Sequence, residues 1–385
     1  MQAHNHFRLL HFSLKKDLDD IYLTLFLRTF ALTLIGIFIP LYLLKELHFA
    51  FADVLMYLMM VYIFLLCGYL IGFVLIRFIR TETLILISIP IQIAYYFLLY
   101  NFDTRNISLA VLGVLLGLSE GIFWLAYNVD FTKFSDKTHR VDEVKIWYVL
   151  ASAIGVIGPL LGGFLLTRFD FHVVFILVII LLCLSFVPLI ALEKRSPVYP
   201  RVIHFKYVFH KGHVKNAQRY YVQGVRHLIT GVFWPLTIFV FVKEYFSLGL
   251  VTSGAAFVSF FVIWWTSGQL TKVNRVVLTD FSALIHGLVS FIKVSVTTFE
   301  QVFLVAIASY TTYGVSEIAA ESLSFDQASK SRPVEFFVFR EVMLTLGRVS
   351  MLAVIFFVGL DLLASLKLGF ILLGAISILQ RFFLH

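Results

Sequence analysis

Two arginines and two glutamates within strongly apolar stretches are the residues of this chain best placed to do chemistry. Arg28 and Glu120 lie in the first half, and Arg226 and Glu317 lie in the second half. The arginines are 198 positions apart and the glutamates 197. A charged side chain inside a bilayer is costly and is seldom retained without a use. This recurrence therefore predicts two copies of one membrane unit that meet around a polar centre.

The depth of these groups favours one ion pair in each half. If Tyr22 and Asp130 mark the membrane interface, Arg28 lies about 9 Å deep and Glu120 about 15 Å deep, at a helical rise of about 1.5 Å per residue. An arginine side chain spans that difference, so we expect Arg28 to pair with Glu120 and the equivalent pair to form in the second half. A second interpretation stays open, in which the two guanidinium groups clamp an anionic substrate.

The second half carries one acid more than the first. Glu321 follows Glu317 by one helical turn, where the first half has Trp124 one turn after Glu120. We expect Glu321 to be unpaired and removed from water, and we hypothesise that it shares a proton with Glu317. Aromatic and polar side chains are expected to add contacts to a solute, namely Trp124, Asn128, Trp234 and Tyr313.

The elements that must position these residues are membrane-spanning helices. The chain is 60% hydrophobic and 14% charged, with a mean hydropathy of +0.92. Its apolar residues occur in runs of roughly 17–25, the length that crosses a bilayer as a helix. The sequence therefore predicts an all-α membrane protein with about twelve transmembrane helices, at residues 21–44, 53–75, 83–101, 107–130, 145–167, 171–192, 220–242, 249–268, 276–295, 300–323, 338–360 and 362–383.

A repeat divides these helices into two pseudo-symmetric bundles of six. Lys45 and Lys243, each followed by glutamate, end the first span of each half at the same offset as the arginines. Copies in the same order are parallel repeats, related by an axis along the membrane normal. We expect an N-terminal bundle at 1–192, a cytoplasmic linker at 193–219 and a C-terminal bundle at 220–385. The linker contains seven lysines or arginines and one glutamate.

The distribution of positive charge predicts the orientation. With the N-terminus in the cytoplasm, the tail, the even-numbered connections with their adjoining span ends, and the C-terminus carry 22 of the 31 lysines and arginines. We therefore expect a multi-pass protein of the plasma (cytoplasmic) membrane with both termini cytoplasmic. The net charge of +8 reflects this orientation, and no nucleic-acid partner is expected. Cys67 and Cys183 both fall inside spans, so neither a disulfide framework nor a metal site is expected.

The fifth predicted span contains a run of small residues and a proline, ASAIGVIGPLLGGFLLTRF. Small residues permit close helix approach, and proline removes a backbone donor. With the span count, this run resembles the major facilitator superfamily over essentially the whole chain, and it fits the glycine–proline motif (motif C) of many proton-coupled exporters. The resemblance implies that the first, fourth, seventh and tenth spans line a central cavity. It also implies a conformational role for Gly155, Gly158, Pro159, Gly162 and Gly163.

The loop after the second span matches the family less closely. Gly72, Arg77 and Arg80 stand where the cytoplasmic gating motif (motif A) has a glycine and two basic residues, so the resemblance implies a gating role for them. Ile76 replaces the acidic residue of that motif and Ile79 its second glycine. The fourth span also departs, since its membrane-embedded charge is the acid Glu120 where many drug exporters of the family carry a basic residue.

Taken together, these observations favour a secondary transporter that moves a small solute by alternating access. Proton-coupled export by antiport is the leading interpretation, and an organic-anion symporter or exchanger is the alternative. A non-transporting receptor or scaffold on the same fold is a further alternative of another class. An enzyme is not expected, since no phosphate-binding glycine loop or metal-ligand spacing is present. We expect no cofactor beyond a proton gradient, a small-molecule substrate and the lipid bilayer as partners, and a monomer.

Overall fold

The computed structural model describes residues 16–102, 107–134, 140–192, 203–214, 216–267 and 274–383. The N-terminal tail before Lys16 and, in the predicted linker, residues 193–202 and Lys215 lie outside these ranges. Within them the secondary structure is helical, with no strand.

Twelve helical segments are long and apolar enough to cross a membrane, which confirms the predicted all-α membrane fold. The first span is α1 (Lys16–Ile35) continued by η2 (Gly36–Phe38), α2 (Ile39–Leu41) and η3 (Tyr42–Glu46), and the seventh is α9 (Ala217–Leu228) continued by η6 (Ile229–Phe233) and α10 (Trp234–Val242). The others are α3 (Phe51–Leu75), α4 (Thr81–Tyr100), α5 (Leu109–Phe134), α6 (Arg140–Arg168), α7 (Phe171–Leu192), α11 (Tyr245–Ser267), α12 (Arg275–Val294), α13 (Phe299–Lys330), α14 (Pro333–Val358) and α15 (Leu362–Phe383).

The first and seventh spans are both irregular, at different places along the span. Each contains a proline, Pro40 in α2 and Pro235 in α10, and each contains a π-helical segment next to it. Proline cannot donate the backbone hydrogen bond of a regular helix, and an added residue in a π turn accommodates that loss. The seventh span therefore changes helical phase near its middle, and the first span changes phase at its end.

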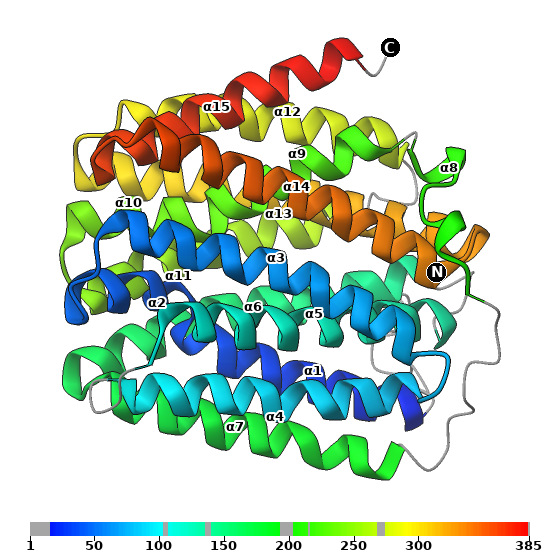
Figure 1. Ribbon diagram of the computed structural model, residues 1–385. Coiled ribbons are helices and arrows are strands. Elements are labelled where there is room, and N and C mark those ends of the chain that lie inside the picture. The colour runs from blue at the N-terminus through cyan, green and yellow to red at the C-terminus, as the bar shows by residue number, and fades with distance from the viewer. Residues whose placement is uncertain are drawn as a thin grey trace, which may run out of the picture.

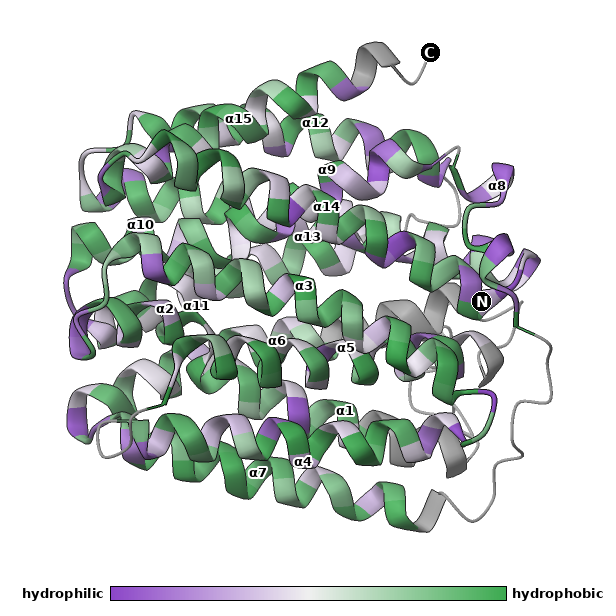
Figure 2. Ribbon diagram, viewed as in Figure 1, coloured by the Kyte–Doolittle hydropathy of each residue, from purple (hydrophilic) through white to green (hydrophobic). Residues whose placement is uncertain are grey.

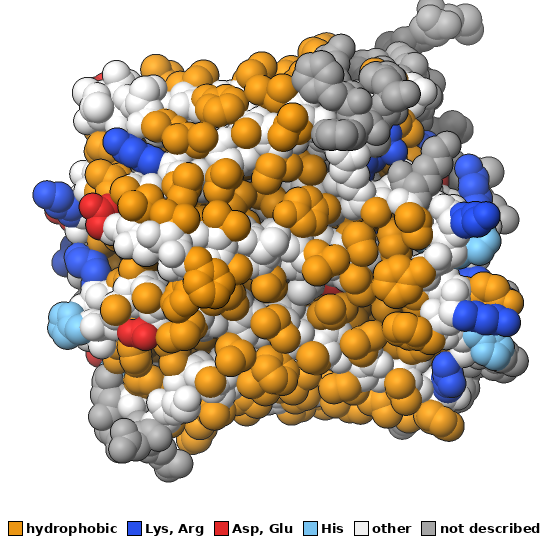
Figure 3. All heavy atoms as spheres, turned by 45° about the horizontal axis from the view of Figure 1, so that its top comes forward, with side chains coloured by type: hydrophobic (Ala, Val, Ile, Leu, Met, Phe, Trp, Pro, Cys, Tyr) orange, Lys and Arg blue, Asp and Glu red, His pale blue; other side chains and the backbone are white. Residues whose placement is uncertain are grey.

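The helices run side by side, with the first six spans on one side of the molecule and the last six on the other (Figure 1). The first span begins and the last ends at the same edge, where α8 (Lys211–Val214) and η5 (Phe205–Tyr207) of the linker also lie. We call this edge the linker face and the other edge, with its short connections, the opposite face. Hydropathy is highest between the two edges (Figure 2), and Lys and Arg gather at both edges of an apolar surface (Figure 3).

Glycines of the fifth span bring three helices into close contact. A Cβ atom on Gly162 of α6 would collide with the backbone of Leu34 in α1, and a Cβ atom on Gly163 would lie 2.5 Å from the carbonyl oxygen of Tyr245 in α11. Gly158 faces Thr33 of α1 in the same way. The glycine–proline run thus packs the fifth span against its own half and against the eighth span of the other half.

The linker docks on both halves at the linker face. Arg77, in the loop after α3, donates to the carbonyl of Ile203 at 2.6 Å, and Arg332, just before α14, stacks on Tyr207 at 3.9 Å from the ring centroid. The His213 ring lies 5.4 Å from the Phe336 ring, and burial lowers the pKa of His213 below its usual value. The linker therefore contributes packing between the halves besides connecting them.

The α6–α11 contact predicts a difference between two identical substitutions. Gly163→Ala should lower the thermal unfolding temperature of the purified protein, because the added methyl overpacks a backbone contact at a cost of about 1–3 kcal/mol. Gly155→Ala should leave it unchanged or raise it, because nothing lies within 4 Å of a Cβ there and alanine is the better helix former. Equal effects of the two changes would contradict the packing role of Gly163.

Candidate functional site

The first-half charges form a closed network. Arg28 of α1 contacts Glu120 of α5 with Nη2 at 2.5 Å from Oε1, so the expected pair is present. Gln92 of α4 accepts from Arg28 Nε at 3.0 Å and donates to Glu120 Oε1 at 2.6 Å. Trp124 Nε1 donates to Glu120 Oε2 at 2.8 Å, and the Arg28 guanidinium lies 3.6 Å above the Phe123 ring. Both carboxylate oxygens therefore have donors, and the arginine is 1% exposed.

The second-half charges repeat this arrangement with two changes: the glutamine comes from the arginine's own helix, and a histidine takes the place of the tryptophan. Arg226 of α9 donates to Glu317 Oε1 of α13 through Nη2 at 2.7 Å and Nε at 3.2 Å. Gln223 Nε2 donates to Glu317 Oε2 at 2.8 Å. The contact that Trp124 of α5 makes in the first half is made here by His227 of α9, whose Nε2 lies 2.8 Å from Glu317 Oε2. A titratable ring thus replaces an indole beside the buried glutamate.

His227 extends the second-half network to α14. Arg348 Nη2 lies 3.0 Å from His227 Nδ1, and Arg348 Nη1 lies 2.7 Å from Glu341 Oε1. A guanidinium only donates hydrogen bonds, so Nδ1 must accept, and the ring proton must sit on Nε2 and be donated to Glu317. The geometry therefore specifies a neutral His227 that bridges an arginine and a glutamate.

The expectation that Glu321 is unpaired is wrong. Both Nη atoms of Arg340 in α14 donate to the Glu321 carboxylate. Arg340 lies toward the linker-face end of the eleventh span, where positive residues are common for topological reasons, so sequence alone gave it no distinct role. Because α13 and α14 are consecutive and antiparallel, their linker-face ends adjoin, and the arginine reaches the acid. Glu321 is thus not the free proton carrier that its extra charge suggested.

A cavity of about 630 Å³ lies between the two halves. Both halves supply aromatic walls: Trp124, Tyr127 and Phe131 from α5, and Tyr310, Tyr313 and Phe325 from α13. Of the sequence-predicted cavity residues, the structure places on this wall Trp124, Asn128, Tyr313, Glu317 and Glu321; of the glycine–proline motif it places there Gly155 and Pro159. His227, Arg340, Glu341 and Arg348 also line it, and the sequence did not single them out as site residues.

Three predicted cavity residues lie behind this wall. Arg28, Glu120 and Arg226 are not among the residues that line the cavity, and the two arginines are nearly fully buried. Their guanidinium donors are directed at glutamate and glutamine oxygens within their own half. This geometry favours the ion-pair interpretation of the two arginines over the substrate clamp.

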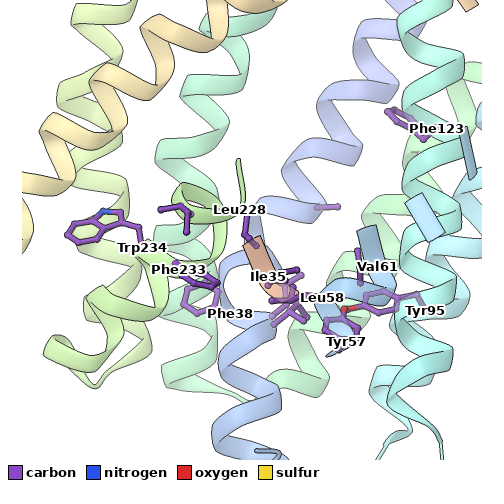
Figure 4. Close-up of a cluster of buried hydrophobic side chains, with 14 of the residues drawn as sticks. Ile35, Phe38, Tyr57, Leu58, Val61, Tyr95, Phe123, Leu228, Phe233 and Trp234 are labelled. Atoms are coloured by element: carbon purple, nitrogen blue, oxygen red, sulfur yellow. The ribbon is translucent and has the colours of Figure 1, made fainter. Parts of the chain in front are cut away.

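Trp234 does not reach the central cavity. Its indole is fully buried, stands 5.9 Å from the Phe370 ring of α15, and points away from Ile35 and Phe38 of the first span (Figure 4). The π segment Ile229–Phe233 lies between Arg226 and Trp234 and shifts the helical phase. A regular helix assumed from sequence therefore gave the wrong direction for this side chain.

The halves touch at both ends of the cavity. At the linker face the Phe131 and Phe325 rings lie 4.5 Å apart between centroids. At the opposite face Tyr245 donates to Glu46 at 2.5 Å, and Lys45 lies 4.7 Å from the Phe239 ring centroid. Each of these contacts must break if the cavity is to open on that side.

The loop residues assigned to gating lie at the linker face. Gly72 packs on Leu125 of α5, Arg77 holds the linker as described above, and Arg80 immediately precedes α4, where its carbonyl accepts from the Leu84 amide. Their gating role stays a prediction.

Over the described ranges no cluster of three or more His, Cys, Asp or Glu side chains could hold a metal ion.

Comparison with known proteins identifies the fold and the family. The chain is 28% identical over 274 residues to uncharacterized protein YqgE of Bacillus subtilis (strain 168), a match that covers 64% of this chain and 60% of that protein, which is less than two thirds of its length. Solved structures with the same fold include the POT family transporter PepTSo (TM-score 0.75, 13% identity, 96% of both chains covered) and the human organic anion transporter MFSD10 (TM-score 0.70, 10% identity, 97% of this chain and all of that chain covered).

A further solved structure with this fold is the transporter FucP in the outward conformation, with a TM-score of 0.66 and 12% identity over 95% of this chain and 98% of that one. The family model described as Major Facilitator Superfamily matches residues 21–350, which include both ion pairs and eleven of the twelve spans wholly or in large part. A match over most of the chain, together with the two bundles and the cavity between them, leads to one conclusion: the chain belongs to the Major Facilitator Superfamily.

Proposed function

We propose that this protein is a secondary transporter that moves a small solute across the membrane by alternating access, with a proton gradient as its energy source. The observation that carries the proposal is the cavity between the two halves, which is bounded by inter-half contacts at each end and walled by charged and aromatic residues. Opening either end exposes the same cavity to one side of the membrane, which is the requirement for alternating access.

Proton coupling is best supported at His227. A second proton on the ring would turn Nδ1 from an acceptor into a donor and set it against the donors of Arg348. Arg348 lies 5.1 Å from the Tyr62 ring of α3, in the other half. Protonation would therefore break the His227–Arg348 contact and disturb the contact between α3 and α14. This is how a proton would bias the halves toward one opening.

The charged and titratable groups around His227 make the proton consequential. Arg226 lies on the same helix, Glu317 and Tyr313 face it from α13, and Arg348 and Glu341 face it from α14. Two arginines and two glutamates balance in this set, so a proton on His227 adds one uncompensated positive charge. This extra charge is relieved when His227 loses the proton again or when the surrounding side chains rearrange. Proton release from His227 is therefore linked to a conformational change.

We propose export by proton antiport as the direction, with both termini in the cytoplasm and the protein in the plasma membrane as a monomer. The support for export is the glycine–proline run at the α6–α11 contact, which resembles motif C of proton-coupled exporters. The organic-anion alternative has less support, because each arginine at or beside the cavity already contacts a glutamate.

The transport proposal predicts solute movement in liposomes that contain the purified protein. A panel of amphipathic amines, uncharged aromatics and carboxylates, each measured by mass spectrometry, should include at least one solute that moves faster than in empty liposomes when a pH gradient is imposed. Glu317→Gln should abolish this movement, because the amide keeps one of the two oxygens that accept from Arg226 and His227 but loses the negative charge that balances the arginine. A panel that binds to the protein but never moves would support the receptor alternative and contradict transport.

The role of His227 predicts a pH-dependent conformation that needs no known solute. With Cys67 and Cys183 replaced by serine, spin labels attached to cysteines introduced by Phe131→Cys and Phe325→Cys, whose parent rings are in contact, should be separated by distances that differ between about pH 5.5 and about pH 8, on either side of the usual histidine range. His227→Gln should remove that difference, because glutamine both donates and accepts but does not titrate in this range. The matched control is His172→Gln, a histidine at the opposite face. An unchanged pH response in the His227 variant would rule out its proposed role.

The pairing of Arg226 with Glu317 predicts strong non-additivity in stability. Arg226→Met alone should cost about 3–5 kcal/mol, because it leaves a buried carboxylate without its cation. The double variant Arg226→Met with Glu317→Met should recover a large part of that loss in thermal unfolding, although it should not transport. If the stability losses of the two single variants simply add in the double variant, the two charges do not stabilise each other and the pairing is contradicted.

A further inference from the structure

A buried lysine in the second half has no counter-charge among the described residues. Lys293, in the last turn of α12, is 2% exposed, and its Nζ has no hydrogen-bond acceptor among the residues that the structure describes. The amine lies 5.0 Å from the Trp234 ring centroid and 5.4 Å from that of Phe370. Aromatic faces offset part of the lost hydration of an ammonium group, but they do not supply the hydrogen-bond acceptors that water did.

This lysine faces a cavity separate from the central one. The cavity, which we call the α12 pocket, has a volume of about 230 Å³ and lies between α10, α12 and α15. Lys293 shares its lining with Lys367, Thr237, Thr297, Phe241 and Phe370, among others. None of its lining residues belongs to the wall of the central cavity. It lies toward the opposite face, where α12 ends and α15 begins.

The charge of the α12 pocket is unlike that of the central site. Its lining, as far as the structure describes the chain, includes two lysines and no aspartate or glutamate. Around the central cavity, by contrast, Arg340 and Arg348 each contact a glutamate. Burying an ammonium ion without a partner is strongly unfavourable, and an anion that enters the pocket would relieve that penalty. The negative charge is therefore expected to come from a ligand.

We propose that the α12 pocket binds an amphiphilic anion, with one carboxylate or phosphate group on an apolar body. Lys293 contacts the anionic group, Lys367 adds a second positive charge, and the Thr237 and Thr297 hydroxyls are within the same lining. Phe241, Phe370 and two leucines contact the apolar body. A free amphiphile and a lipid headgroup share this chemistry, and both have access to the end of a membrane-spanning bundle.

Octanoate is the probe that tests the site, with octanol as its uncharged counterpart. The full-length protein in phosphatidylcholine nanodiscs should bind octanoate, and Lys293→Met should weaken this binding by about 10- to 100-fold, the range for losing a hydrogen bond to a charged group. Lys367→Met should weaken it less. The exposed Lys243→Met at the same face should leave it unchanged. Octanol binding should not depend on any of the three lysines.

Two further measurements complete the test. The Lys293→Met variant lacks a buried charge, so its unfolding temperature should equal or exceed that of the unmodified protein. If this variant does not fold, Lys293→Gln is used for the same binding measurement. Adding phosphatidylglycerol to the nanodiscs should lower the apparent octanoate affinity if the ligand is a lipid headgroup and leave it unchanged if it is a free anion. Equal octanoate affinity in the unmodified protein and the Lys293 variants would overturn the proposal.

Discussion

The pairing of a buried arginine with a buried glutamate is the interaction on which both halves of this protein depend. Arg28 and Glu120 join the first and fourth spans, and Arg226 and Glu317 join the seventh and tenth. A guanidinium group carries five donors, and in the first half the Gln92 oxygen and the Phe123 ring take up what a single carboxylate cannot accept. Since removal of either partner leaves an uncompensated charge, each pair resists separation of its two helices. Rigidity within each half leaves the contacts between halves as the part that can change.

The difference between the halves matters as much as their likeness. In the first half Trp124 completes the coordination of Glu120, and the network ends there. In the second half His227 of the seventh span makes the equivalent contact and also contacts Arg348, which lies beside Tyr62 of the other half. The first repeat thus contains a fixed cluster of charges. In the second repeat, we infer that protonation of the cluster affects the contact between the two halves.

The sequence predicts the fold well because membrane helices satisfy their own backbone hydrogen bonds, so apolar run lengths locate all twelve spans. It also predicts the partners of Arg28 and Arg226, since depth along a helix follows from residue counting. It fails where side-chain direction depends on an irregular turn, as for Trp234 after the π segment. It also fails for Glu321, whose partner is Arg340. Positive residues near span ends are expected from membrane orientation alone, so the sequence gave no sign that Arg340 pairs with a glutamate.

The separation of the paired charges along the chain has a consequence for synthesis. Glu120 follows Arg28 by 92 residues, and Glu317 follows Arg226 by 91. At ribosomal rates of about 5–20 residues per second, each arginine is synthesised roughly 5–20 s before its glutamate partner. During that interval the newly made first span of each half holds an uncompensated cation, so it must stay near water or the insertion machinery until the fourth span arrives. The ion pair of each half can then enter the bilayer without waiting for the other half.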